Sequence, residues 1–225
     1  MAELIVFDLD GTLLDSEGVG EAAFREAFQR TGGIGDPPVA AFKAQAGRPF
    51  EVICERLGLP AEIVAEFRAA ATRLRSRVRV FDGAQDLLRA LTARGATLAV
   101  LTGKDRPRTM QLRVERGLID SFDAGLTPDD PLAAKPAPDG VLWLAARADV
   151  DVRSVVLVGD APSDITAGST AGATTIGCTW GVSTAQMLFA AGADQVVYSI
   201  AQLSAALRVH PGGDISPARG IETPT

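Results

Sequence analysis

Five short apolar runs constrain the fold of this 225-residue chain more than any other feature. They are rich in Val, Ile and Leu, and they lie at residues 4–9, 96–101, 154–159, 173–177 and 194–198. Runs of this length and composition are typical of strands that are buried on both faces of a parallel sheet. Stretches with helical spacing separate them. The sequence therefore predicts an α/β fold with right-handed crossovers and an open, doubly wound, mostly parallel sheet.

Two of the intervening stretches carry clear helix signals. A first helix is expected to be capped by Asp82 and to end near Gly95. A second helix is expected from Pro138 to Val150. The apolar residues expected to face the sheet and the core are Leu87, Leu88 and Leu91 in the first helix and Val141, Leu142, Trp143, Leu144 and Ala145 in the second.

The segment from Ser16 to Arg79 breaks the alternation, because its apolar residues recur at helical spacing and it contains no strand pattern. In an open α/β sheet a ligand binds at the carboxyl ends of the strands, so a helical insertion after the first strand would cover the site. We therefore expect an α/β core domain at 1–15 and 80–210, an inserted α-helical cap domain at 16–79, and a flexible tail at 211–225.

Composition excludes several classes of function. The formal net charge of −6 argues against a nucleic-acid partner, which requires a basic face. No apolar run is long enough to cross a bilayer and no signal peptide is evident, so we expect a cytoplasmic protein without a membrane partner. Cys54 and Cys178 lack metal-ligand spacing and are expected to be buried. The single histidine, His210, argues against a histidine triad or a multi-histidine metal site. The sequence indicates no oligomeric state.

Acidic residues follow two of the predicted strands. Asp8 and Asp10 end the first run and, by alternation along a strand, lie on one side of it. Carboxylates this close repel by about 4 kcal/mol at an effective dielectric constant near 20, a cost that a cation offsets. Asp160 and Asp164 follow the run at 154–159. If the two strands are neighbours, hard oxygen ligands converge there, and such ligands suit Mg²⁺.

A hydroxyl and a lysine complete this set. Thr102 and Gly103 end the run at 96–101, and Lys135 lies just before the helix expected from Pro138. Together with the acids they suit phosphoryl transfer. The metal and the lysine neutralise the phosphoryl oxygens, the hydroxyl and backbone donors position them, and one carboxylate attacks phosphorus.

Four motifs, in order along the chain, resemble those of the haloacid dehalogenase-like superfamily. They are DLDGTLLDSE at 8–17, LTGK at 101–104, KPAPD at 135–139 and GDAPSD at 159–164. The resemblance implies a Rossmann-like core with a small helical cap. It also implies a Mg²⁺-dependent phosphatase, similar to phosphoglycolate phosphatase, that hydrolyses a small phosphorylated metabolite through an aspartyl-phosphate.

The same resemblance implies a role for each site residue. Asp8 is the implied nucleophile, and Asp10 is the implied acid that protonates the leaving oxygen and then the base that deprotonates water. The implied Mg²⁺ ligands are the Asp8 carboxylate, the Asp10 backbone carbonyl and Asp160, with Asp164 as a further ligand or an acceptor behind them. The residues assigned to the phosphate are Gly11, Thr102, Gly103 and Lys135.

The motifs also depart from the family pattern. Many phosphoglycolate-phosphatase-like and phosphoglucomutase-like members carry Asn where this chain has Gly103, and the combination of TGK, KPAPD and GDA is more similar to phosphatases associated with 3-amino-5-hydroxybenzoate biosynthesis. Arg48 lies where the family places a loop that touches the substrate, and its guanidinium can fork onto a carboxylate or hydroxyls. Two alternatives stay open: a phosphomutase of the same fold, and a signalling receiver module that is phosphorylated on Asp.

Overall fold

The computed structural model describes residues 4–208, so His210 and the expected tail at 211–225 lie outside the described residues. The strands are β1 (Leu4–Phe7), β2 (Leu14–Asp15), β3 (Arg79–Val80), β4 (Thr97–Leu101), β5 (Ala124–Leu126), β6 (Val155–Gly159), β7 (Thr174–Cys178) and β8 (Gln195–Val197). The α-helices are α1 (Glu17–Arg30), α2 (Val39–Lys43), α3 (Phe50–Leu57), α4 (Ile63–Leu74), α5 (Ala84–Ala93), α6 (Arg106–Glu115), α7 (Asp139–Arg147), α8 (Pro162–Ala171), α9 (Ala185–Ala190) and α10 (Ile200–Arg208).

Among the described residues, six strands form one sheet in the order β5-β4-β1-β6-β7-β8. All neighbouring pairs are parallel, and β1 is central, with Leu4 opposite Thr97 of β4 and Val155 of β6. The strand order reverses at β1, which is the position where open α/β sheets bind ligands. The predicted doubly wound α/β fold is confirmed.

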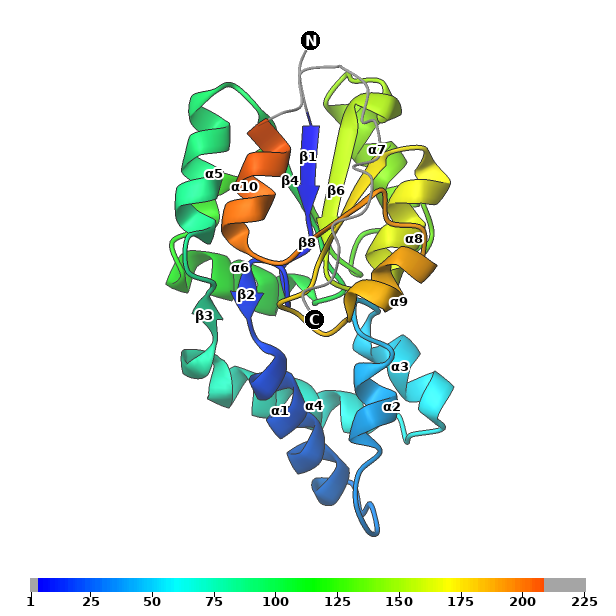
Figure 1. Cartoon of the computed structure of the whole chain (residues 1–225). Helices are drawn as coiled ribbons and strands as arrows, with labels where there is room; N and C mark the ends of the chain where they lie inside the picture. Colours follow the sequence, from blue (N-terminus) through cyan, green and yellow to red (C-terminus); the bar gives the residue numbers. More distant parts are fainter. Residues whose placement is uncertain (1–3, 209–225) are drawn as a thin grey trace, which may run out of the picture.

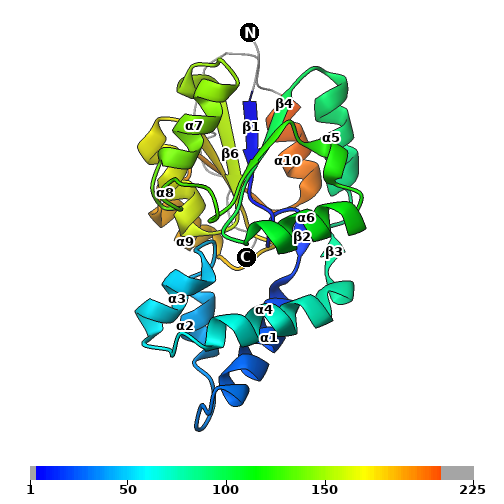
Figure 2. The same cartoon turned by 180° about the vertical axis from the view of Figure 1, so that it is seen from behind.

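Alternation along β1 divides the core into two apolar clusters. Ile5 and Phe7 pack with residues of α5 and α10, whereas Leu4 and Val6 pack with residues of α7 and α8. Figure 2 shows helices on both faces of the sheet. A strand covered on both faces buries every residue, and this explains why β1 consists of four apolar residues in succession.

Helices α1 to α4 form a separate layer beyond the carboxyl ends of the parallel strands (Figure 1). In the sequence these helices come between β2 and β3, and the two strands pair with each other in an antiparallel ribbon. These helices share an apolar cluster of their own that includes Phe24, Phe50 and Phe67. The expected helical insertion is therefore present. The division into domains at residues 15/16 and 79/80 stays a prediction.

The structure adds three short strands that the sequence pattern did not predict. β5 has only three residues, one of them Gly125, and lies between Asp123 and Thr127. β2 and β3 have two residues each, too few for any periodicity to show. The expectation that residues 16–79 contain no strand is wrong for Arg79, which pairs with Asp15.

Helix α7 buries fewer residues than predicted. Val141, Leu144 and Ala145 pack against the sheet. Leu142 and Trp143, in contrast, are 45% and 41% exposed, so their predicted burial is wrong. Successive residues of a helix turn by about 100°, and therefore the two residues between Val141 and Leu144 point away from the sheet.

Three further expectations concern single features of the described residues. α5 begins at Ala84 and has Gly83 at its N-cap, so the predicted cap at Asp82 is wrong. Cys54 and Cys178 are buried free thiols, as predicted. Between residues 4 and 208, no helix combines the length and the apolar character that crossing a bilayer requires.

Candidate active site

The candidate site forms where three neighbouring strands end. Asp8 follows β1, Thr102 follows β4 and Asp160 follows β6, and β1 lies between the other two strands. The carboxyl ends of parallel strands meet at one edge of a sheet, so residues that are far apart in sequence line one cavity there. The sequence predicted that Asp8, Asp10 and Asp160 converge if their two strands are neighbours, and β1 and β6 are neighbours in the sheet.

Three buried carboxylates and one ammonium form the floor of the site. Asp8, Asp160 and Asp164 each offer an oxygen within 4.8 Å of the others. The Nζ of Lys135 lies 2.9 Å from Oδ1 of Asp8 and 2.6 Å from Oδ1 of Asp164. One ammonium offsets one of the three carboxylates, which leaves a surplus of two negative charges. Mg²⁺ fits these residues, because it prefers hard oxygen ligands and carries the missing charge.

The pKa values of Asp8, Asp160 and Lys135 reflect the same excess of carboxylates over ammonium groups. Burial raises the pKa of Asp8 to about 7 despite the adjacent Lys135 ammonium. Burial, together with the Asp8 carboxylate, raises the pKa of Asp160 well above its ordinary value. Burial acts to lower the pKa of Lys135, but the carboxylates of Asp164 and Asp8 outweigh it and raise that pKa. The lysine therefore stays charged, while the carboxylates need further positive charge to ionise together.

Donors from the surrounding loops hold Asp160 and Asp164 in place. The Thr12 hydroxyl donates to Oδ1 of Asp160 at 3.1 Å, and the Val182 N–H donates to its Oδ2 at 2.9 Å. Asp164 lies in the first turn of α8, where its Oδ2 accepts from the Ala161 N–H at 3.0 Å. Its Oδ1 accepts from the Lys135 ammonium. The same carboxylate therefore caps α8 and belongs to the charged cluster.

Gly11 is required by the close approach of Asp160. Its φ is 80°, and a Cβ at this position would lie 2.1 Å from Oδ2 of Asp160. The Gly11 N–H donates to the Leu14 carbonyl at 2.8 Å. This amide already has a partner in the fold, and a role for Gly11 in phosphate binding stays a prediction.

Asp10 lies outside the carboxylate cluster and has its own partners. The Ser16 hydroxyl donates to its Oδ1 at 2.5 Å, and the Nζ of Lys104 lies 2.9 Å from its Oδ2. Burial acts to raise the pKa of Asp10, but the Lys104 ammonium and the Ser16 hydroxyl outweigh it and lower that pKa. Sequence reasoning assigned no role to Lys104 or Ser16. The signal for Lys104 was its position at the same sheet edge, two residues after Thr102.

Three of the four residues predicted to hold phosphate, Gly11, Thr102 and Gly103, line the same cavity. The Thr102 hydroxyl oxygen accepts from the Lys104 N–H at 3.2 Å, which leaves its proton free to be donated. Lys135 is buried next to the cavity, and its ammonium contacts Oδ1 of Asp8, which lines the cavity, at 2.9 Å. A hydroxyl, a backbone segment and a cation thus lie near one buried carboxylate, and this set can hold a phosphoryl group against that carboxylate.

The loop that carries Arg48 covers the cavity and contacts the core on two sides. Its Ala46 carbonyl accepts from the Ser163 hydroxyl at 3.2 Å, and a Cβ on Gly47 would lie 2.3 Å from that hydroxyl oxygen. On the other side, a Cβ on Gly103 would lie 2.7 Å from the Gly47 carbonyl oxygen. Small residues at these contacts allow the insertion and the core to approach closely.

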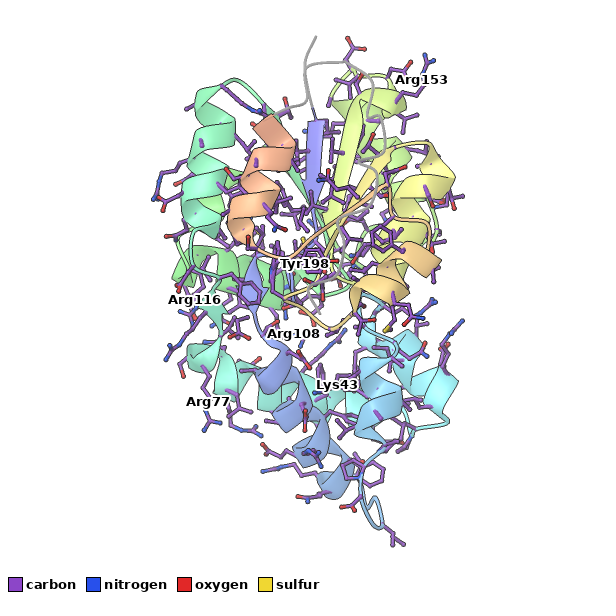
Figure 3. The ribbon with its side chains drawn as sticks, viewed as in Figure 1. Lys43, Arg77, Arg108, Arg116, Arg153 and Tyr198 are labelled. Atoms are coloured by element: carbon purple, nitrogen blue, oxygen red, sulfur yellow. The ribbon has the colours of Figure 1, made fainter. Side chains whose placement is uncertain are left out.

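Arg48 itself lines the cavity. Burial, together with the nearby Arg56, lowers the pKa of its guanidinium. Among residues 4–208, no side chain or carbonyl pairs with that guanidinium. Figure 3 shows a second arginine, Arg108, between the core and the inserted helices. Arg108 also lines the cavity, where it lies 5.3 Å from the centroid of the Phe67 ring.

A buried carboxylate, a lysine and an oxygen-rich cluster at the switch point of an α/β sheet are the groups of a phosphotransfer enzyme, here with an inserted helical layer. The chain belongs to the haloacid dehalogenase-like hydrolases, whose family model matches residues 5–178. This membership removes the receiver-module alternative.

Two relatives with similar sequences are named as phosphatases. The chain is 32% identical to the probable phosphatase IndB of Dickeya dadantii over 213 residues, covering 90% of this chain and 92% of the relative. It is 30% identical to a phosphoglycolate phosphatase of Vibrio vulnificus over 217 residues, covering 89% of this chain and 94% of the relative. The fold matches a hydrolase of Pseudomonas syringae with a TM-score of 0.83 at 24% identity, over 92% of this chain and 98% of that one. The predicted enzyme class, a phosphoric monoester hydrolase, is confirmed.

Proposed function

We propose that this chain is a magnesium-dependent phosphatase that hydrolyses a small phosphorylated metabolite through a phosphorylated Asp8. One observation carries the proposal. The Asp8 carboxylate lies at the floor of a cavity, 2.9 Å from the Lys135 ammonium and in a cluster whose three buried carboxyl groups outnumber that ammonium by two. Asp8, Asp160 and Asp164 are the side chains that fit a bound Mg²⁺, with the Asp10 carbonyl as a further ligand. When bound, the ion supplies positive charge that reduces the repulsion between carboxylate and phosphoryl oxygens.

In the first half of the reaction, a carboxylate oxygen of Asp8 attacks phosphorus. The bond between phosphorus and the ester oxygen breaks, and the carboxyl group of Asp10 gives its proton to that oxygen. Thr102, Gly103 and Lys135 hold the phosphoryl group in line for this attack. Lys135 also offsets the negative charge that Asp8 and the phosphoryl group bring together.

In the second half, Asp10 takes a proton from water, and the water oxygen attacks the same phosphorus atom. The bond between phosphorus and Asp8 breaks, inorganic phosphate leaves, and the Asp8 carboxylate is restored. The pairing of Asp10 with Lys104 favours its ionised form. This arrangement suits the second half, in which Asp10 must be a carboxylate. The pair has to loosen when Asp10 acts as the acid.

Arg48 is our candidate for recognition of the organic part of the substrate. Its guanidinium borders the cavity and has no partner among the described residues, which supports a contact with a carboxylate or hydroxyls of the substrate. One of the relatives above is named for phosphoglycolate and the name of the other gives no substrate, so the identity of the metabolite is a separate question.

The test is phosphate release from p-nitrophenyl phosphate. We expect release with Mg²⁺ and none with excess chelator or in Asp8→Asn, because an amide cannot act as the nucleophile. Asp15→Asn is the matched control, since it removes an exposed carboxylate of β2. Activity that survives in Asp8→Asn would remove the nucleophile assignment. With a hexose 1-phosphate, formation of hexose 6-phosphate without free phosphate would favour the phosphomutase alternative.

A further inference from the structure

The cavity above the carboxylates has a polar end and an apolar end. Its polar end contains Asp8, Asp160 and Thr102, and its far end is formed by residues of the inserted helices and by the segment that joins them to the core. A phosphate ester whose phosphorus lies at Asp8 must therefore place its organic part in the far end. The apolar residues of that end are Val19, Phe42, Phe50, Ile53, Phe67 and Val78.

Three aromatic rings form one wall of this far end. The rings of Phe50 and Phe67 stack with their centroids 3.8 Å apart, and Phe42 meets them edge-on at 6.1 and 6.2 Å. The contacts fix these rings relative to one another, so the wall is preformed. A rigid apolar wall binds an apolar group without the entropy cost of ordering side chains.

Ile53 is an apolar residue of the far end that lies outside the core cluster of the insertion. It is 4% exposed, yet it belongs to none of the three apolar clusters of the described residues. Its side chain lines the cavity. A substitution of Ile53 therefore changes the wall of the cavity without removing a member of the core cluster to which Phe50 and Phe67 belong.

Polar groups at the far end are largely occupied with each other. Lys43 lies 2.8 Å from a carboxylate oxygen of Glu17, and Arg75 lies 2.9 Å from one of Glu115. A hydrophilic group placed against these two pairs would lose its water without gaining equivalent partners, so polar recognition of the organic part is left to Arg48. An apolar group gains from the same surface.

The cavity volume sets the size of the group. It is about 160 Å³ for both ends together, close to the volume of about 150 Å³ of an apolar protein cavity that holds one benzene molecule, and the phosphoryl group takes part of it. Resting on the proposed function, we infer that the substrates of this site are phosphate monoesters whose organic part presents a compact apolar face to Ile53 and the aromatic wall. Short hydrophilic esters, which leave this surface in water, are poor substrates.

Two alkyl esters test the inference, because their leaving alcohols have similar basicity. We expect kcat/KM for cyclohexylmethyl phosphate to exceed that for ethyl phosphate by at least about 100-fold, since each methylene in an apolar pocket adds about tenfold or more. Ile53→Thr keeps the branched shape but adds a hydroxyl to the pocket, and it should reduce this ratio by about tenfold. Ile34→Thr makes the same change at a residue of the insertion that is 95% exposed and should leave the ratio unchanged.

A binding measurement separates this inference from the proposed function. Cyclohexylmethylphosphonate, which cannot be hydrolysed, should bind at least about tenfold more tightly than ethylphosphonate in calorimetry with Mg²⁺. If this holds while neither ester releases phosphate, the pocket assignment stands and the proposed function fails. If both esters are hydrolysed with kcat/KM values within threefold, or if Ile34→Thr changes the ratio as much as Ile53→Thr, the inference is overturned and the phosphatase assignment remains.

Discussion

Adding one methyl group at Gly103 tests whether the insertion must close onto the core for catalysis. A Cβ at this position would lie 2.7 Å from the carbonyl oxygen of Gly47 and 2.9 Å from the carbonyl carbon and oxygen of Arg48. All three are backbone atoms, so no side-chain rotation can relieve the contact. The loop that carries Arg48 has to move away from the core in Gly103→Ala.

The required movement gives the size of the effect. Moving from 2.7 Å to an ordinary contact of 3.4 Å displaces the loop by about 0.7 Å, and a misplacement of about 1 Å costs a rate up to about 100-fold. We therefore expect kcat/KM to fall by about 10- to 100-fold. The variant should still fold, because Gly103 does not have a positive φ and alanine adds no backbone strain there. The effect on stability is that of the displaced loop.

The assay is kcat/KM for p-nitrophenyl phosphate with Mg²⁺, measured beside the melting temperature of each variant. Gly18→Ala is the matched control, because Gly18 is an exposed residue of α1 and a Cβ there would meet no atom within 4 Å. It should keep full activity and gain up to about 1 kcal/mol of stability, since alanine favours a helix more than glycine does. If Gly103→Ala is folded and keeps kcat/KM within threefold, close approach of this loop is not required for catalysis.

Three further predictions concern the charged groups of the site. Asp10→Asn should still bind Mg²⁺ and phosphate in calorimetry but turn over at least about 100-fold more slowly, because its amide cannot transfer the proton; a near-native rate would give Asp10 a structural role only. Lys135→Met should lose about 3–5 kcal/mol of unfolding free energy in urea, because it leaves buried carboxylates without their ammonium. Lys43→Met is the control, because Lys43 and its partner Glu17 are each 37% exposed, and it should lose at most about 1 kcal/mol of unfolding free energy. Equal losses in Lys135→Met and Lys43→Met would contradict the charge balance proposed for the floor. In chelator, stability should decrease as the pH rises from about 4 to about 7. Asp8 keeps its proton up to about pH 7 in the folded protein but releases it near 3.8 when unfolded. A flat urea titration across this window, or a slope that is not reduced in Asp8→Asn, would refute this last prediction; the part that remains in the variant is expected from Asp160.

The central strands could be predicted from sequence because burial on both faces forces a continuous apolar run. β1 and β6 bury every residue and lie side by side in the middle of the sheet. β5 could not be predicted in this way. It lies at the sheet edge with β4 as its one neighbour, and only Leu126 of its three residues is buried. The pairing of β2 with β3 depends on the chain returning after four helices, which leaves no local signal.

Site residues could be predicted where topology alone brings them together. Asp8, Thr102 and Asp160 each follow a strand, and the strand order of the sheet places them at one edge. Which lysine pairs with which aspartate depends on the directions of their side chains, and residue spacing in the sequence does not determine these directions. Sequence alone could not show that Lys104 pairs with Asp10 while the other site lysine reaches Asp8. The apolar end of the cavity was equally hidden, because its residues share a helical pattern with the core of the insertion.

The charge of the floor connects the proposed nucleophile to the proposed metal. Asp8 has one ammonium, that of Lys135, within hydrogen-bond distance among the described residues, and burial still raises its pKa to about 7. A protonated carboxyl group is a poor nucleophile, so near neutral pH much of the metal-free protein cannot start the reaction even with a phosphate ester in place. Two additional positive charges allow Asp8 and Asp160 to ionise together. We therefore expect a need for a divalent cation before any substrate binds, because the sheet topology places more carboxylates at this edge than Lys135 can neutralise.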